Sequence, residues 1–458
     1  MKMKTSQLMR LLVIAALTVL SQCTAPSARA VSPPPIDERR LPVPALPAPQ
    51  QPTVQREICT VAKEASDRAD LPAQLADLDL AQIWQLTRGA GQRVAVIDTG
   101  VSRHRRLSDL VAGGDYVANG DGTQDCDAHG TLVAGIIAAA PSSTTDRFSG
   151  MAPDVTLISI RQSSAKFAPV GDRSGSGVGD VDTLAKAVRT AADLGASVIN
   201  ISSVACVPAA DALDDRALGA ALAYAVDVKN TVVVAAAGNS GGGAQCPAQR
   251  PDMTRDTVTV AVSPAWYDDY VLTVGSVNVK GEPSAFTLAG PWVDVAATGE
   301  GVTSLSPVGD GLVNGIDGQH GSEPLSGTSY AAPVVSGLAA LIRARFPSLS
   351  ARQVMARIEA TAHHPPSGWD PLVGNGTVDA LAAVSTGTTP PSPSRAEVAT
   401  PVAMPIGKPP TPKPLNNRAR DTAFGGAAIC LVALVATLGL GAVSGRKPRL
   451  RQHGVAGN

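Results

Sequence analysis

From residue 92 onward, short apolar runs alternate with segments of helical periodicity, and this alternation constrains the fold more than any other feature. Residues 94–97 form a short, continuous apolar run, and residues 231–237 are apolar after Thr231, as strands covered on both faces are. Strands that alternate with helices form a parallel sheet, and sites in such sheets lie beyond the carboxyl ends of the strands. We therefore expect an α/β fold, a parallel sheet with helices on both faces. The expected strands are residues 94–97, 155–160, 197–202, 231–237 and 271–274, and the expected helices are residues 131–140, 182–194, 214–228, one from 329 and one after 350.

Residues 327–333 read Gly-Thr-Ser-Tyr-Ala-Ala-Pro and open an apolar run at 334–342. A Ser in the first turn of a buried helix has its hydroxyl beside free backbone N–H groups and the positive end of the helix dipole, which favour developing negative charge. Ser329 is therefore a candidate nucleophile. The alternative is an ordinary helix cap. A base, an orienting carboxylate and an oxyanion donor elsewhere in the chain decide between the two.

Three further polar residues follow predicted strands or begin a predicted helix. Asp98 begins an Asp-Thr-Gly turn directly after residues 94–97, although such turns often follow strands and aspartic proteases carry the same tripeptide. His129 lies at a Gly-flanked helix start, where a lone His is more often structural. Asn239 stands in a Gly-rich turn after residues 231–237, where an ordinary turn residue is the alternative.

The four residues have complementary chemistry. A Ser hydroxyl needs a base, a neutral imidazole such as that of His129 is the natural one near neutral pH, and a buried carboxylate such as Asp98 fixes its tautomer. The tetrahedral oxyanion then needs donors, which the Asn239 amide and the backbone N–H of Ser329 can supply. Together the four motifs favour nucleophilic catalysis over four unrelated structural roles.

Both ends of the chain carry apolar segments. Two Lys residues, the uncharged residues 11–20 and an Ala-x-Ala signal predict a secretory signal peptide at 1–30. The uncharged residues 424–443 are long enough to cross a membrane, and the basic segment after them should stay cytoplasmic. The expected layout is a signal peptide (1–30), a Pro-rich N-terminal extension (31–90), a domain that carries the four candidate residues (91–385), a Pro-rich linker (386–422), a transmembrane helix (423–444) and a cytoplasmic tail (445–458).

Cysteine usage agrees with export. Of six Cys, four remain between the signal peptide and the predicted span, and four allow three pairings. Cys206 and Cys246 each follow a predicted strand, and loops at the same end of neighbouring parallel strands can be close. We therefore pair Cys206 with Cys246 and, by elimination, Cys59 with Cys126. The alternative is four free, buried thiols.

The four segments resemble the signature blocks of subtilisin-like serine proteases, in the order Asp, His, Ser that subtilisin itself has. This resemblance covers residues 90–385. It implies a subtilisin fold, with Asp98 as the orienting residue, His129 as the general base, Ser329 as the nucleophile and Asn239 as the oxyanion donor. The segments are residues 96–101 (Val-Ile-Asp-Thr-Gly-Val), 129–135 (His-Gly-Thr-Leu-Val-Ala-Gly), 237–239 (Ala-Gly-Asn) and 327–333.

Within this family, nearly the whole chain resembles the mycosins, the membrane-anchored proteases of actinobacterial type VII secretion systems. The resemblance rests on the two apolar ends, the Pro-rich extension, the four Cys and residues 157–164 (Leu-Ile-Ser-Ile-Arg-Gln-Ser-Ser). It implies an extracytoplasmic endopeptidase that acts on few protein or peptide substrates and associates with the secretion membrane complex. Two segments depart from the usual subtilisin patterns. They are residues 202–206, in the strand that pairs with substrate, and residues 296–299, which lack a common Pro.

The remaining observations limit other functions. With 38 basic and 39 acidic residues the chain has no charge excess to attract nucleic acid. The acidic residues are too scattered to assign a calcium site, and the adjacent His363 and His364 lack metal-ligand spacing, so we expect no cofactor. Two competing functions are a structural subunit of the secretion complex with dispensable catalysis and a general degradative subtilisin. The extension lacks the alternation of a folded inhibitory propeptide, so we expect a retained arm.

Overall fold

The computed structural model describes residues 31–385 with short gaps. The gaps are residues 66–71, 77, 143–145, 173–176, 210, 212, 242–245, 254–256 and 319–320. The described residues belong to one compact unit, Met1–Ser394. The predicted signal peptide (1–30), linker (386–422), transmembrane helix (423–444) and tail (445–458) lie outside the described residues. None of the helices within the described part is long and apolar enough to cross a membrane.

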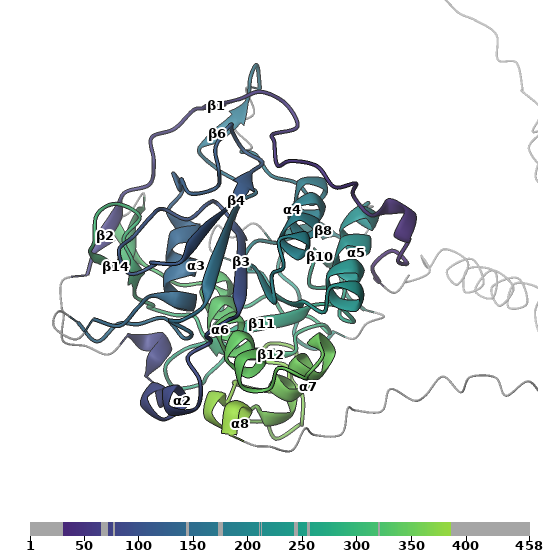
Figure 1. The fold of residues 1–458 in the computed structure, drawn as a ribbon. Helices are drawn as coiled ribbons and strands as arrows, with labels where there is room; N and C mark the ends of the chain where they lie inside the picture. The colour runs from purple at the N-terminus through teal and green to yellow at the C-terminus, as the bar shows by residue number, and fades with distance from the viewer. Residues whose placement is uncertain are drawn as a thin grey trace, which may run out of the picture. The chain divides into compact units, whose positions relative to one another are not determined.

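A seven-stranded parallel sheet forms the centre of the molecule, in the order β12-β11-β9-β7-β3-β5-β4 (Figure 1). The inner strands are almost wholly buried, as strands covered on both faces are. The sheet confirms the predicted α/β fold. Its strands are β3 (Arg93–Asp98), β4 (Leu110–Asp115), β5 (Thr156–Arg161), β7 (Val198–Ile201), β9 (Val232–Ala236), β11 (Leu272–Val277) and β12 (Val295–Thr298).

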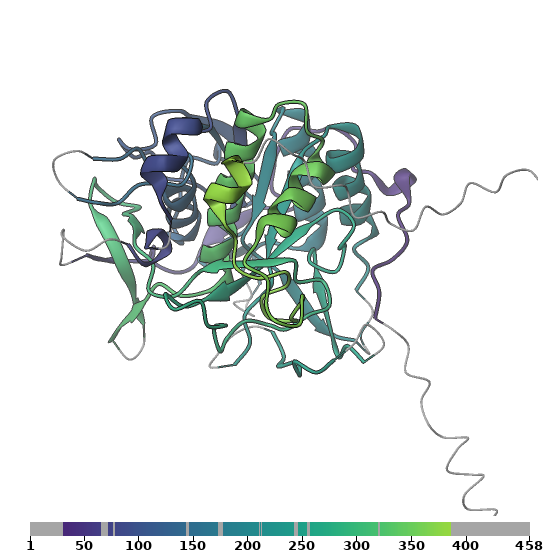
Figure 2. The same cartoon turned by 90° about the horizontal axis from the view of Figure 1, so that it is seen from below.

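Two pairs of helices pack on this sheet (Figure 2). Helix α3 (His129–Ala138) contacts α6 (Thr328–Arg345), and α4 (Val181–Asp193) contacts α5 (Arg216–Ala223). Helix α6 also contacts β7, β9, β11 and β12, and every side chain from Tyr330 to Ile342 is buried. A helix that is apolar on all sides belongs in a core, so α6 is the central helix that the apolar run predicts.

The structure differs from the predicted elements in several places. Strands β4 and β12 were not predicted, because β4 contains two Gly residues and β12 is a four-residue run with two Ala, and neither has a strong strand pattern. The helix predicted at 214–228 ends as α5 at Ala223 and continues as a π-helical turn, η3 (Tyr224–Val228). The last predicted helix is α7 (Ala351–Thr361), which begins with a capping box between Ser350 and Gln353.

The N-terminal arm, residues 31–90, runs around the outside of the unit (purple in Figure 1). Its short strands pair with the rest of the chain and not with each other, which explains why the arm lacks the alternation of a folded domain. Strand β1 pairs with β6, and β2 pairs with β14. The arm ends in α2, whose Ile83 is fully buried, and α2 contacts α8. The bounds are η1 (Glu38–Arg40), β1 (Thr53–Gln55), β2 (Ala62–Glu64), η2 (Ala73–Leu75), α2 (Leu80–Leu86), β6 (Phe167–Pro169), β14 (Leu312–Gly318) and α8 (Ala380–Ser385).

Two disulfides join the expected pairs of Cys. Cys59 of the arm is bonded to Cys126, three residues before His129, with the Cα atoms 4.5 Å apart. Cys206 is bonded to Cys246, with the Cα atoms 5.2 Å apart. Cys206 lies in β8 (Ala205–Pro208), which pairs with β10 (Val260–Ser263). Strands β13 (Ser304–Leu305) and β15 (Gly321–Pro324) complete the elements by pairing with β14.

Candidate active site

Asp98 is the last residue of β3, in the middle of the sheet. Its side chain is only 2% exposed. Its Oδ1 accepts hydrogen bonds from the backbone N–H of Thr99 and from Nδ1 of His129, each at 2.7 Å. The site therefore lies beyond the carboxyl end of a central strand, as the alternation of strands and helices predicts.

His129 is the first residue of α3, and its ring faces the carboxylate of Asp98 at the end of β3. Because Nδ1 bonds to a carboxylate oxygen, Nδ1 carries the proton in the neutral ring and Nε2 is the basic nitrogen. Burial by itself lowers the pKa of His129, but the negative charges of Asp98, Asp125 and Asp127 outweigh burial and hold the pKa above its ordinary value. The ring of Tyr330 lies beside the imidazole, with the centroids 5.4 Å apart.

Ser329 lies in the first turn of α6, where Gly327 is the N-cap. A Cβ placed on Gly327 would lie 3.1 Å from Ser329 Oγ and also 3.1 Å from Nδ2 of Asn239. The hydroxyl and the amide nitrogen therefore border the same small space, which Gly327 leaves open because it has no side chain. A developing oxyanion in this space would be close to the amide donor.

The amide of Asn239 is held by the start of α6. Its Oδ1 accepts hydrogen bonds from the backbone N–H of Thr328 at 3.0 Å and from the Thr328 hydroxyl at 2.9 Å. The same hydroxyl accepts a hydrogen bond from the backbone N–H of Gly238 at 3.1 Å. Because Oδ1 is occupied by two donors, the amide group is turned so that Nδ2 is the atom presented next to Ser329.

A series of buried side-chain hydrogen bonds holds the backbone at Ser329. The sequence patterns did not predict it. Ser202 Oγ donates to the carbonyl oxygen of Ser329 at 2.8 Å and accepts from Nδ2 of Asn200 at 2.9 Å. Ser336 Oγ donates to Oδ1 of Asn200 at 2.8 Å. One signal was available, because a polar Asn in the apolar strand β7 and a Ser in the apolar run of α6 both require buried partners.

A cleft of about 690 Å³ extends from His129 and Tyr330. Residues 177–181 and 203–205 line it, and Thr60 of the arm and Ile316 of β14 also contribute to its lining. A concave site beside the candidate base is where a substrate can bind.

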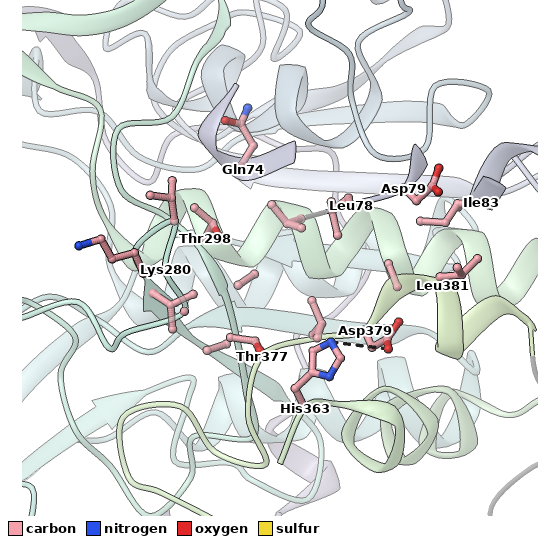
Figure 3. Close-up of a pocket in the computed structure, with 18 residues that line it drawn as sticks. Gln74, Leu78, Asp79, Ile83, Lys280, Thr298, His363, Thr377, Asp379 and Leu381 are labelled. Carbon is pink, nitrogen blue, oxygen red and sulfur yellow. Dashed lines mark ion pairs between the residues drawn. The ribbon is translucent and has the colours of Figure 1, made fainter. Parts of the chain in front are cut away.

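A second cavity of about 520 Å³ lies apart from these residues, between the end of the arm and α8 (Figure 3). Gln74 and Asp79 of the arm region line it, together with His363 and Asp379, whose Nε2 and Oδ2 are 3.6 Å apart. None of the four predicted catalytic residues lines this cavity. Within the described residues, no group of three or more His, Cys, Asp or Glu side chains could hold a metal ion.

Comparisons with known proteins agree with this geometry. The Subtilase family model (peptidase family S8) matches residues 89–376. The chain is 73% identical to Mycosin-4 from Mycobacterium tuberculosis over 460 residues, which is 100% of both chains. The crystal structure of MycP1 from the ESX-1 type VII secretion system superposes with a TM-score of 0.73 at 44% identity, over 79% of this chain and 98% of that one.

A third similar structure comes from a larger assembly. The periplasmic assembly of the ESX-5 inner membrane complex contains a chain that superposes with a TM-score of 0.74 at 43% identity, over 84% of this chain and 100% of that one. The family match covers more than half of the chain, and the identity to Mycosin-4 extends over its whole length. The chain is therefore a subtilisin-like serine endopeptidase of the subtilase family, and within that family it belongs to the mycosins.

Proposed function

We propose that this mycosin cleaves peptide bonds through an acyl-enzyme formed on Ser329. In this mechanism His129 Nε2 removes the proton from the Ser329 hydroxyl as Oγ attacks the scissile carbonyl carbon, and Asp98 holds the imidazole in the required tautomer. The 2.7 Å hydrogen bond between Asp98 and His129 is the observation that carries the proposal. A His with only a structural role would not need a buried carboxylate bonded to Nδ1, which leaves Nε2 as the basic nitrogen.

The oxyanion of the tetrahedral intermediate would lie in the space beside Gly327. There it would accept hydrogen bonds from Asn239 Nδ2 and from the backbone N–H of Ser329, at the positive end of the α6 dipole. His129 then gives its proton to the leaving amine, and the ester on Ser329 remains. Water, activated by the same imidazole, hydrolyses the ester and restores the free Ser329 hydroxyl.

The substrate would be a protein segment in extended conformation. The support is the cleft beside His129, which residues 177–181 and 203–205 line. The departure of residues 202–206 from the usual subtilisin pattern changes one of these segments. The specificity of other subtilisins therefore does not carry over to this cleft, and we propose a narrow substrate range because the resemblance to the mycosins implies few substrates.

The cellular setting is a second part of the proposal. The ESX-5 neighbour belongs to a periplasmic assembly of an inner membrane complex. By analogy, this chain would act with the membrane complex of a type VII secretion system, with residues 91–385 on the extracytoplasmic side and residues 423–444 as a single membrane anchor. The signal peptide at 1–30 and the basic tail at 445–458 agree with this orientation.

The arm at 31–90 would be retained and would not act as an inhibitor. Its strands pair with β6 and β14, the Cys59–Cys126 disulfide binds it to the protease domain, and among its described residues Thr60 lines the cleft. A cut within the arm would not release the part that Cys59 holds. An N-terminus near residue 90 in the mature protein, measured by mass spectrometry, would overturn this part of the proposal.

A structural role is the second candidate function, because the ESX-5 neighbour was solved as part of an assembly. The two roles are separated by a fluorophosphonate probe, which reacts with activated Ser hydroxyls. We expect the full-length protein to be labelled, Ser329→Ala to remain unlabelled, and Ser367→Ala, which changes an exposed Ser elsewhere, to be labelled like the wild type. Equal labelling of Ser329→Ala would contradict the acyl-enzyme mechanism. A secretion complex that assembles normally with Ser329→Ala would show that assembly does not need catalysis.

A further inference from the structure

Asp125 lies four residues before His129 and accepts hydrogen bonds from both of the segments that carry the proposed orienting residue and base. Oδ1 accepts from the Thr99 hydroxyl at 2.9 Å, and Thr99 directly follows Asp98. Oδ2 accepts from the backbone N–H of Thr131 at 2.8 Å and from its hydroxyl at 2.7 Å. One carboxylate therefore joins the end of β3 to the first turn of α3.

The two hydroxyls bound to Asp125 continue into the backbone on both sides. Thr99 Oγ1 accepts a hydrogen bond from the backbone N–H of Gly130 at 2.9 Å. Thr131 Oγ1 accepts from the backbone N–H of Ser102 at 2.9 Å. The bonds thus cross between the segments in both directions, and the segments cannot move apart without breaking several of them.

Asp125 also replaces the cap that α3 lacks. The N-cap residue is Ala128, which has no side-chain acceptor and is held at a φ of 71°. The free N–H groups of Gly130 and Thr131 are satisfied instead by Thr99 Oγ1 and by Asp125. A carboxylate at this position also interacts favourably with the positive end of the helix dipole.

We propose that Asp125 is a positioning residue of the protease, which fixes the distance between Asp98 and His129 and adds to the negative charge near the imidazole. This inference rests on the proposed role of His129 as the general base. Asp125 touches neither substrate nor the nucleophile in this account. It acts through Thr99 and Thr131, to which it is hydrogen-bonded.

The groups around His129 determine the sign of the charge effect. They are Asp98 on β3, Asp125 and Asp127 in the segment before α3, and Tyr330 on α6. Each of the three carboxylates raises the pKa of His129. Burial raises the pKa of Asp125 itself to about 6, although its bonds to Thr131 and Thr99 oppose this. Loss of the Asp125 charge should therefore lower the pKa of His129.

The test compares the full-length wild type with Asp125→Asn and with Asp121→Asn as the matched control. Asp121 is exposed in the same segment and bonds to Thr123, away from His129. The rate of fluorophosphonate labelling is measured against pH. For Asp125→Asn we expect the plateau rate to fall about tenfold to hundredfold, because a displaced base lies outside attack geometry. We expect the midpoint of the acid limb to move down by about one pH unit or less. Asp121→Asn should match the wild type in both.

Several outcomes would overturn the proposal. One is a folded Asp125→Asn protein whose plateau labelling rate equals that of the wild type. This outcome counts against the proposal even if the pH midpoint moves, because a change in charge alone would not show that Asp125 positions the base. If Asp125→Asn does not fold, Thr99→Val decides, since it removes one bond to Asp125 and the acceptor of Gly130. Its plateau should fall severalfold and recover in Thr99→Ser, and a wild-type plateau in Thr99→Val would contradict the proposal.

A second readout separates this inference from the proposed function. Diethyl pyrocarbonate acylates neutral imidazole, and mass spectrometry reads the modification at His129 without any need for Ser329. The midpoint of this reaction should also move to lower pH in Asp125→Asn. An unlabelled wild type would count against the acyl-enzyme mechanism, whereas an unmoved His129 midpoint would count against the role of Asp125.

Discussion

Asn239 directs its side-chain oxygen to Thr328, at 3.0 Å from the backbone nitrogen and 2.9 Å from the hydroxyl, and so presents its amide nitrogen beside Ser329. The two partners are 89 residues apart in the chain and meet only because β9 and α6 are packed together. The orientation of the proposed oxyanion donor is therefore built into the contact between a strand end and a helix start.

Asn239→Ala removes this donor, together with the oxygen that accepts from the backbone N–H and the hydroxyl of Thr328, so a thermal midpoint near the wild-type value is measured first. We expect kcat to fall by about 10² to 10³ with little change in KM, because the lost hydrogen bond forms with the oxyanion and not with the ground-state substrate. The measurement is steady-state hydrolysis of a peptide substrate, with Asn119→Ala, at an exposed position, as the control. A rise in KM at unchanged kcat would assign Asn239 to substrate binding instead.

Gly327→Ala places a methyl group in the space between the nucleophile and the donor. The added Cβ would lie 3.1 Å from both Ser329 Oγ and Asn239 Nδ2, which is closer than an ordinary carbon contact. The backbone of Gly327 is extended, with a φ of 162°, so Ala is not excluded by conformation. We expect fluorophosphonate labelling to slow at least about tenfold while the thermal midpoint stays near the wild-type value, since the change blocks oxyanion stabilisation. A wild-type labelling rate would show that the oxyanion lies elsewhere.

The catalytic rate should fall at acid pH, with a midpoint above the ordinary pKa of a His side chain. The base acts when it is neutral, and Asp98, Asp125 and Asp127 outweigh burial and raise the pKa of His129. The rate should therefore rise with pH through a midpoint above about 6.5. The raised pKa of His129 also stabilises the folded protein below about pH 6.5. This stabilisation is lost as the pH rises through the pKa of the folded state. A profile of kcat/KM against pH tests the first point, and a midpoint below 6 would contradict it.

Glu359 on α7 should lower stability at neutral and alkaline pH. Burial, with Asp268 nearby, raises the pKa of Glu359 from 4.5 to about 7. Because the folded pKa lies above the unfolded one, the fold loses stability as the pH rises from about 4.5 through 7 and the carboxyl ionises. Glu359→Gln should raise the thermal midpoint at pH 8 more than at pH 5. Equal shifts at the two pH values would show that the carboxyl does not titrate in this range.

The Cys59–Cys126 disulfide should hold the arm to the protease domain. It closes a loop of 67 residues, for which chain entropy predicts about 4 kcal/mol of stabilisation. Cys59→Ala with Cys126→Ala should lower the thermal midpoint and let trypsin release the arm on non-reducing gels. The matched pair is Cys206→Ala with Cys246→Ala, which removes the other disulfide and should leave the arm attached. Release of the arm from both variants would contradict a specific role for Cys59.

The sheet and the positions of the predicted catalytic residues could be predicted because their signals are local. The apolar run that ends at Asp98, the Gly-flanked His129 and the motif around Ser329 each lie within a few residues. Parallel topology then brings the ends of the strands to one edge. Strand β12 could not be predicted, because a four-residue run with two Ala acquires its strand character from pairing with β11.

Polar contacts between residues far apart in the chain could not be predicted from the sequence patterns. The bond from Ser202 to the carbonyl oxygen of Ser329 joins residues 127 apart, and no periodicity specifies it. Asp125 is a second case, because only the fold brings Thr99 to it, 26 residues away. The pairing of β2 with β14 is likewise set by the path of the arm around the domain, which a three-residue strand does not encode.

The central claim is that Ser329 is the nucleophile, and mapping of the covalent adduct tests it most directly. The full-length protein is treated with a fluorophosphonate and digested, and the modified peptide is sequenced by tandem mass spectrometry. The account predicts a single phosphonyl group on Ser329, with none formed in His129→Ala because the base is absent. An adduct on another residue, or an undiminished adduct on Ser329 in His129→Ala, would contradict it.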